Sequence, residues 1–173
     1  MERAESSGDV REERLRRWIA EYSEAILRAC RLLLSDRGQA EDAMQDTFLK
    51  AWRHMADYEK KHVENDKAWL LRIAANTCRD YRRSAWFRRV DRRADWADLS
   101  PDPSAQGDRL LTVCVGQLAD KYRQVIVLYY YQRLTLQETA EALGIPVSTA
   151  HRRLRKAEAL LREQWLGGDR DEA

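Results

Sequence analysis

The chain has 173 residues, of which 44% are hydrophobic and 35% are charged, and it contains only seven glycines and three prolines. This composition argues against an all-β fold that depends on many tight turns, and it favours helices in one ordinary domain or two small ones. The 31 basic residues nearly balance the 29 acidic residues, so a preference for nucleic acid has to come from how the charges are distributed along the chain.

The cysteines and the apolar segments limit the class of protein further. Cys30, Cys78 and Cys114 are far apart, and none belongs to a CxxC pair. A zinc site or a disulfide framework is therefore not expected. We expect three buried thiols in a reducing cytoplasm instead. No apolar run reaches the length of a signal peptide or of a membrane span. We expect a cytoplasmic protein without membrane insertion, cofactor or metal.

The N-terminal half has the apolar periodicity of three helices. Residues 1–10 are polar and are expected to be frayed. An apolar face then continues through residues 15–33, and a second one occupies residues 40–55. The segment 56–65 is polar and lacks periodicity, which predicts a loop. Asp66 is expected to cap a third helix with Trp69 on its inner face.

Residues 84–107 interrupt this pattern and predict a flexible linker, because Pro101 and Pro103 disfavour helix. The charge changes sign along this part of the chain. Residues 67–93 hold nine Lys and Arg against two Asp, whereas residues 94–108 hold four Asp and no Lys or Arg. The excess of seven positive charges in the first stretch favours contact with nucleic acid over a merely solvated face.

The C-terminal half predicts a second helical unit that begins near Asp108. Asp120 is expected to cap one of its helices. Thr135 and Glu138 fit a capping box, in which each side chain satisfies a free backbone N–H group. Gly144 then supplies a left-handed turn before a last helix over residues 147–165. The predicted fold class is all-α, with two small helical domains joined by a flexible linker and a helix-turn-helix in the second domain.

The last helix has the features of a DNA-recognition helix. Ala140 and Gly144 allow two helices to cross closely, and Ala150 and Leu154 face back toward the first of them. The opposite face carries Ser148, Thr149, His151, Arg152, Arg155 and Lys156. Arg can bond guanine through two hydrogen bonds, and hydroxyl groups can take phosphates or base edges. The alternative is an ordinary helical hairpin with a solvated basic face, but the capping box, the small residues and the basic helix all favour DNA binding.

The predicted third helix carries a second polar stripe, formed by Arg72, Asn76, Arg79, Arg82 and Arg83. These residues lie three or four apart, so they share one helix face. Such a face can hold a phosphate backbone and hydrogen-bond a base, and neighbouring aromatic residues could stack on unpaired bases. For Trp69 we favour core packing, because it lies on the apolar face.

Three motifs, in order, resemble those of the extracytoplasmic-function sigma factors of bacterial RNA polymerase. The segment AEDAMQDTFLKAWR, residues 40–53, is similar to the polymerase-binding helix AEDxxQxxFLxxW of that family. The segment AWLLRIAAN, residues 68–76, is similar to its AWLxxIAxN signature, and GIPVST, residues 144–149, is similar to its GIPVGTV turn. Ser148 departs from the usual glycine of this turn. His151, Arg152 and Arg155 are an individual combination, which leaves the promoter sequence open.

The resemblance implies a division of labour. Residues 11–86 would form the domain that binds core polymerase and the −10 element, residues 87–107 the linker, and residues 108–166 the domain that binds the −35 element as duplex. It implies polymerase binding through Asp42, Gln45, Asp46, Phe48 and Trp52, although core packing is an equal alternative for the two aromatic residues. The loop 56–65 corresponds to one that captures a flipped base, and the choice between Tyr58 and His62 stays open.

The resemblance also implies the partners, which are core RNA polymerase, promoter DNA and an anti-sigma factor. The alternative function is a helix-turn-helix regulator that binds an operator without being a polymerase subunit. The motifs at residues 40–53 and 68–76 argue against this alternative. An enzyme that acts on nucleic acid is a further alternative, but the sequence offers no metal-ligand cluster, phosphate-binding glycine loop or nucleophile–base pair.

Overall fold

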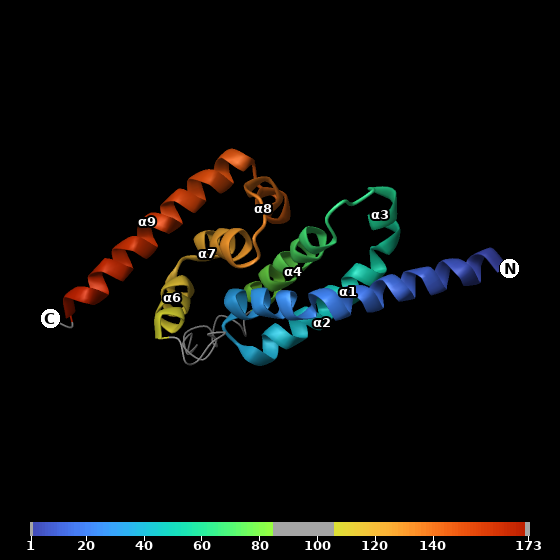
Figure 1. Ribbon diagram of the computed structural model, residues 1–173, viewed down its shortest axis with the longest axis horizontal. Coiled ribbons are helices and arrows are strands. Elements are labelled where there is room, and N and C mark those ends of the chain that lie inside the picture. Colours follow the sequence, from blue (N-terminus) through green and yellow to red (C-terminus); the bar gives the residue numbers. More distant parts are fainter. Residues whose placement is uncertain (1, 85–105, 172–173) are drawn as a thin grey trace.

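The computed structural model describes residues 2–84 and 106–171, with side chains from 8 to 84 and from 110 to 167. Within these ranges the chain is helical and has no strand, so the all-α prediction is confirmed. The helices form two groups that lie side by side (Figure 1). The first group contains α1 (Glu2–Leu34), α2 (Arg37–Arg53), α3 (Met55–Lys60) and α4 (Asp66–Arg83). The second contains α6 (Gln106–Gln117), α7 (Asp120–Ile126), the π-helix η3 (Val127–Tyr131), α8 (Leu136–Leu143) and α9 (Val147–Asp171). The predicted linker lies almost wholly outside the described residues.

The first group is built on α1, α2 and α4, which all contact one another. Trp18, Ile26 and Leu33 of α1 are fully buried in their common core. Asp36 separates α1 from α2, and its Oδ1 atom accepts a hydrogen bond of 2.7 Å from the backbone N–H of Gln39. The expectation of a frayed segment 1–10 is wrong, because a helix that is already nucleated by packing propagates readily into flanking residues.

The predicted loop 56–65 is also wrong in part, because its first half forms α3. Only Met55 of this helix is buried in the core, so two or three apolar residues were too few to show a period. Asp66 does not cap α4 as expected. Asn65 is the N-cap, and its Oδ1 atom accepts from the backbone N–H of Ala68 at 3.0 Å, while Asp66 binds tertiary partners.

In the second group, α7 and α8 both pack against α9. Ala119 and not Asp120 is the N-cap of α7. The carboxylate of Asp120 instead pairs with Arg82 of α4, at 3.2 Å, and with Arg123 of its own helix. The prediction that Asp120 caps α7 is therefore wrong, because two arginines take the carboxylate.

The helix-turn-helix itself is confirmed in its local detail. Both hydrogen bonds of the predicted capping box are present, from the Glu138 backbone N–H to Thr135 Oγ1 at 3.1 Å and from the Thr135 N–H to Glu138 Oε2 at 2.8 Å. Gly144 follows α8 with φ of 64°, in the left-handed region that glycine adopts without strain. Cys30, Cys78 and Cys114 are buried free thiols, as expected.

The two groups touch through α4 and α8 and through α1 and η3. The Nζ atom of Lys67 donates to the backbone carbonyl of Gln132 at 2.9 Å, and Nδ2 of Asn65 donates to Oε1 of Glu138 at 2.6 Å. The side chain of Gln132 in turn donates to the carbonyl of Ala25 at 3.1 Å. These hydrogen bonds lie beside apolar packing, because buried residues of both groups belong to one continuous core. None of the described helices combines the length and the apolarity that crossing a bilayer requires.

Candidate nucleic-acid interface

The first turns of α9 present a basic surface that nothing in the described chain covers. Ser148, His151, Arg152, Arg155 and Lys156 are exposed, and Thr149 is half-buried. The opposite face is buried, with Ala150 at 0% and Leu154 at 6% exposure, because it packs against the rest of the second group. The structure therefore brings all six predicted residues onto one accessible side of α9, as a helix that enters a major groove requires.

The polar stripe of α4 is less uniform than the sequence predicts. Arg72, Asn76 and Arg83 are exposed and Arg79 is half-buried. Arg82 is only 8% exposed and pairs with Asp120 of α7. Burial lowers the pKa of Arg82, and the neighbouring carboxylate of Asp120 opposes that effect. In this arrangement the stripe is accessible at Arg72 and Asn76 and engaged in tertiary contacts at Arg82.

A cleft of about 860 Å³ lies next to this stripe. The exposed residues Arg72 and Asn76 of α4 and the loop at residues 61–65 form one side of it, while α8 contributes Glu138 and Glu141 to the other. Basic groups and carboxylates thus line the same cleft. The backbone of His62 at the tip of the loop has φ of 45°, which is uncommon for a residue other than glycine.

The structure distinguishes the two loop residues that the sequence left open. The hydroxyl of Tyr58 donates to Oδ1 of Asp66 at 2.5 Å, and its ring meets those of Trp18 and Trp69. Burial, followed by the contact with the Asp66 carboxylate, raises the pKa of Tyr58 to about 12. Tyr58 is therefore a packed, hydrogen-bonded residue. His62 is exposed at the loop tip, where it is free to meet a ligand.

The residues predicted on the polymerase-binding helix divide between two faces of α2. Asp42 and Gln45 are exposed, and Trp52 has 41% of its surface exposed. Phe48 is 7% exposed and belongs to the core. Asp46 is half-buried, and its Oδ2 atom accepts from the hydroxyl of Tyr81 at 2.8 Å. Core packing is thus the outcome for Phe48 but not for Trp52.

Leu49 completes the exposed face of α2, although it is not among the residues predicted to bind polymerase. Its exposure is 54%, the largest on α2 among the exposed large apolar residues. It lies four residues after Gln45 and three before Trp52, so the three share one helix face. The sequence does contain a signal for Leu49. It is an apolar residue that does not fit the apolar periodicity to which Phe48 belongs. Exposed apolar residues beside polar ones are typical of a protein-binding surface.

Within the described ranges there is no group of three or more His, Cys, Asp or Glu residues that could hold a metal ion. The exposed side chains described above form three candidate surfaces, on α2, α4 and α9. Two of them are basic and belong to different helix groups, and the third is mixed apolar and polar.

Comparison with known proteins agrees with this arrangement. The model of sigma-70 region 2 matches residues 18–88, and that of sigma-70 region 4 matches residues 108–161. The extracytoplasmic-function sigma factor SigL of Mycobacterium tuberculosis is 35% identical over 148 residues, which cover 82% of this chain and 83% of SigL. The chain belongs to the extracytoplasmic-function sigma factors.

Other relatives extend the match in sequence and in structure. The RNA polymerase sigma-E factor of Streptomyces coelicolor is 30% identical, over 89% of this chain and 87% of its own length. A solved structure of CnrH in complex with the cytosolic domain of CnrY is similar with a TM-score of 0.66 and 26% identity, over 91% of this chain and 90% of that one.

As a sigma factor, the protein is a promoter-specific transcription initiation factor that acts with RNA polymerase. The region 2 match contains α2 and α4, and the region 4 match contains α8 and most of α9. A helix-turn-helix regulator that acts without polymerase would not need the region 2 helices, so that alternative is not favoured. The family resemblance seen in the sequence is confirmed.

Proposed function

We propose that this sigma factor reads the −35 element as duplex through Ser148, Thr149, His151, Arg152, Arg155 and Lys156 of α9. The observation that carries the proposal is the open basic surface on the first three turns of that helix. The N-terminal residues of a recognition helix lie nearest the bases. Arg152 and Arg155 are close to one turn apart, so at least one of them would reach a guanine edge.

In the same proposal, α4 holds the melted −10 element through Arg72, Asn76, Arg79, Arg82 and Arg83. The polar groups that α4 and the loop 61–65 contribute to the cleft support this, because a base that leaves the stack needs a recess with polar groups. Asn76 offers a donor and an acceptor for a base, and the arginines offer charge for phosphates. His62 does not line this cleft, but it is exposed at the neighbouring loop tip, and we propose it as the loop residue that meets such a base.

Core RNA polymerase would bind to the exposed face of α2. Asp42, Gln45 and Trp52 are proposed to contact the polymerase, and Leu49 joins them because of its exposure. Asp46 and Phe48 would support this face from behind, through the hydrogen bond to Tyr81 and through core packing. Carboxylates and amides can meet basic groups on a partner helix, while Leu and Trp supply apolar area.

The remaining assignments follow from these. The domain that binds polymerase and the −10 element is proposed to span residues 11–86, the linker residues 87–107 and the −35-binding domain residues 108–166. The protein is proposed to act in the cytoplasm, to catalyse no reaction itself and to be held inactive by an anti-sigma factor. The similar CnrH structure, which is a complex with the cytosolic domain of CnrY, supports that last partner.

Two variants of α2 test the polymerase surface. Trp52→Ala should weaken binding to core polymerase in the absence of DNA and leave thermal stability nearly unchanged, because Trp52 is 41% exposed. Phe48→Ala should instead lower the free energy of unfolding by about 3–5 kcal/mol, the usual result of truncating a buried Phe. Affinity for core polymerase and thermal unfolding are measured for both. Wild-type protein that binds promoter DNA but not core polymerase would contradict the proposal and favour an operator-binding regulator.

A further inference from the structure

Helix α3 needs support from outside its own sequence. It has only six residues, and the side chain of its N-cap residue, His54, makes no capping hydrogen bond. A helix of this length is not stable by itself in water. Its buried contribution to the core is limited to Met55. The loop 61–65 that borders the cleft follows α3 directly, so whatever fixes α3 also fixes where that loop begins.

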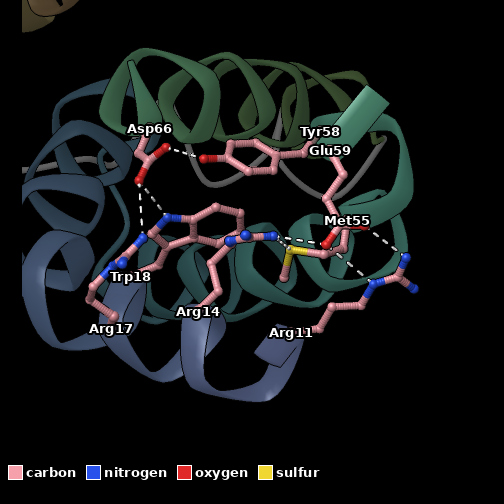
Figure 2. Close-up of polar contacts among 8 residues, drawn as sticks. All are labelled: Arg11, Arg14, Arg17, Trp18, Met55, Tyr58, Glu59 and Asp66. Carbon is pink, nitrogen blue, oxygen red and sulfur yellow. Dashed lines mark hydrogen bonds and ion pairs between the residues drawn. The ribbon is translucent and has the colours of Figure 1, made fainter. Parts of the chain in front are cut away.

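The N-terminal part of α1 supplies this support through Glu59. Nη2 of Arg11 lies 2.8 Å from Oε2 of Glu59, and Nη1 of Arg14 lies 2.8 Å from Oε1. Figure 2 shows both guanidinium groups pointing at this one carboxylate. Arg14 also lies over the ring of Tyr58, with 5.2 Å from its Cζ atom to the ring centroid. The hydrogen bond from Arg11, together with that from Arg14, lowers the pKa of Glu59.

The far end of the loop is fixed to the same helix. Asp66, the first residue of α4, accepts from Nε1 of Trp18 at 2.9 Å, and Arg17 lies 3.7 Å from the same carboxylate oxygen (Figure 2). Tyr58 closes the arrangement with its hydroxyl on the other oxygen of Asp66. The rings of Trp18, Tyr58 and Trp69 meet with centroids 4.9–5.4 Å apart, a favourable separation for aromatic pairs.

Both ends of the loop 61–65 are therefore attached to α1, while the loop itself borders the cleft. We propose that Arg11 and Arg14 are positioning residues that set the base preference of the loop at the −10 element. This inference rests on the proposed function of α4 and the loop. Arg11 and Arg14 precede residue 18, where the match to sigma-70 region 2 begins, so they add a determinant outside the matched segment.

A positioning role requires that the contacts of Arg11 and Arg14 with Glu59 contribute little to the overall stability of the protein. Arg11, Arg14 and Glu59 keep 36%, 24% and 34% of their side-chain surface exposed, so loss of one pair should not unfold the protein. It should instead allow α3 and the start of the loop to move relative to α4. Binding of core polymerase should stay unchanged, because neither arginine belongs to the exposed face of α2.

The test uses holoenzyme assembled from the full-length chain and core polymerase of the source bacterium. The probe is a pool of randomised single-stranded DNA, from which holoenzyme selects its preferred sequence. The variants are Arg14→Ala, Glu59→Gln and the double variant. Arg16→Ala is the matched control, because Arg16 is an arginine of the same helix whose partner is Glu12, one turn away. Core affinity and thermal unfolding are measured for every protein.

We expect Arg14→Ala and Glu59→Gln each to reduce the preference at a single base position by about fivefold, which corresponds to about 1 kcal/mol. The double variant should lose little more than Glu59→Gln alone, because that change already removes the carboxylate that Arg14 binds. Arg14→Lys, which keeps the positive charge, should restore part of the preference. Arg16→Ala should select the wild-type sequence with wild-type preference.

The outcomes separate this inference from the function on which it rests. If wild-type holoenzyme selects no sequence, the assignment of α4 and the loop to the −10 element fails, and the positioning role fails with it. If the wild type selects a sequence and the variants select it equally well, only the positioning role fails. The positioning role also fails if the variants lose core affinity, thermal stability and base preference together, since that pattern indicates a general structural contribution.

Discussion

The basic faces of α4 and α9 differ in how far the rest of the chain covers them. Five of the six residues selected on α9 are exposed. On α4, Arg82 is 8% exposed beside Asp120, and α8 lines the cleft that contains Arg72 and Asn76. The surface assigned to duplex DNA is open, whereas the surface assigned to melted DNA is partly occupied by the helix-turn-helix unit. We therefore expect that full access to α4, and to Arg82 in particular, requires the two groups to separate.

The largest expected effect comes from preventing that separation. Glu64 and Gln137 are exposed residues on opposite sides of the cleft, so Glu64→Cys with Gln137→Cys can be joined by a short, reductant-cleavable crosslinker. The native cysteines are buried and should not compete. We expect the crosslinked protein to form open complexes at least about a hundredfold less well, because the separated arrangement is no longer available. Permanganate footprinting measures the melting.

Two comparisons make the crosslinking result interpretable. Binding of duplex −35 DNA should stay close to that of the wild type, and cleavage of the crosslinker should restore melting. The double variant before crosslinking provides the reference. Normal melting by the crosslinked protein would contradict the idea that α8 obstructs α4.

An intermediate effect is expected at the open face. Arg152→Ala or Arg155→Ala should lower affinity for the −35 element by about 1–3 kcal/mol and relax preference at one base position, as loss of a bidentate guanine contact does. Lys156→Ala should weaken binding to all sequences and reduce the salt dependence by about one unit, as loss of a phosphate contact does. Transcription from a library of randomised −35 elements separates the two patterns.

Arg162→Ala is the control for these variants, because it removes an exposed arginine of α9 beyond its first three turns. It should leave the preferred sequence unchanged. If neither Arg152→Ala nor Arg155→Ala alters the preferred sequence, α9 acts as an electrostatic anchor and does not read bases.

The smallest effect concerns Glu138, which serves both groups. Hydrogen bonding from the Thr135 backbone N–H, aided by Asn65, lowers the pKa of Glu138 below its ordinary value of 4.5. The stabilising contribution is therefore fully present above that value and is lost as the pH falls through the lowered pKa. We expect Glu138→Gln to reduce the stability of the second group by less than about 1 kcal/mol at neutral pH.

Thermal unfolding of wild type and Glu138→Gln between neutral and acidic pH checks this expectation, and the difference between the two should shrink as the pH falls. Glu141→Gln removes the same charge from the same helix without touching the capping box. Equal behaviour of the two variants would show that the lost charge, and not the cap, is responsible.

The parts of the fold that depend on short-range signals could be predicted from the sequence. Thr135, Glu138 and Gly144 determine the start and end of α8 within ten residues, and all three have the predicted conformation or contacts. The six residues of the α9 face follow from helical spacing alone. Their roles in DNA binding remain predictions.

The features that depend on distant residues could not be predicted. Asp66 stands where a helix cap is expected from the sequence. Its carboxylate instead accepts a hydrogen bond from Trp18, 48 residues earlier in the chain. Asp120 likewise pairs with Arg82, which removes one arginine from an otherwise regular polar stripe. Helix α3 was missed because it has few apolar residues, and the partners of its Glu59, Arg11 and Arg14, lie far away in α1. In each case the local sequence offers a group, and tertiary structure decides its partner.

The hydrogen bonds between the two helix groups have a thermodynamic consequence. Lys67, Asn65 and Gln132 donate hydrogen bonds across it, and water can replace each of them when the groups part, so the net free energy of each bond is modest. We expect that a ligand can redistribute closed and separated forms. Any ligand that binds one form more tightly shifts the equilibrium by its differential affinity and no more. The free energy of separating the two groups would therefore change the measured affinity of this sigma factor for core polymerase and for promoter DNA.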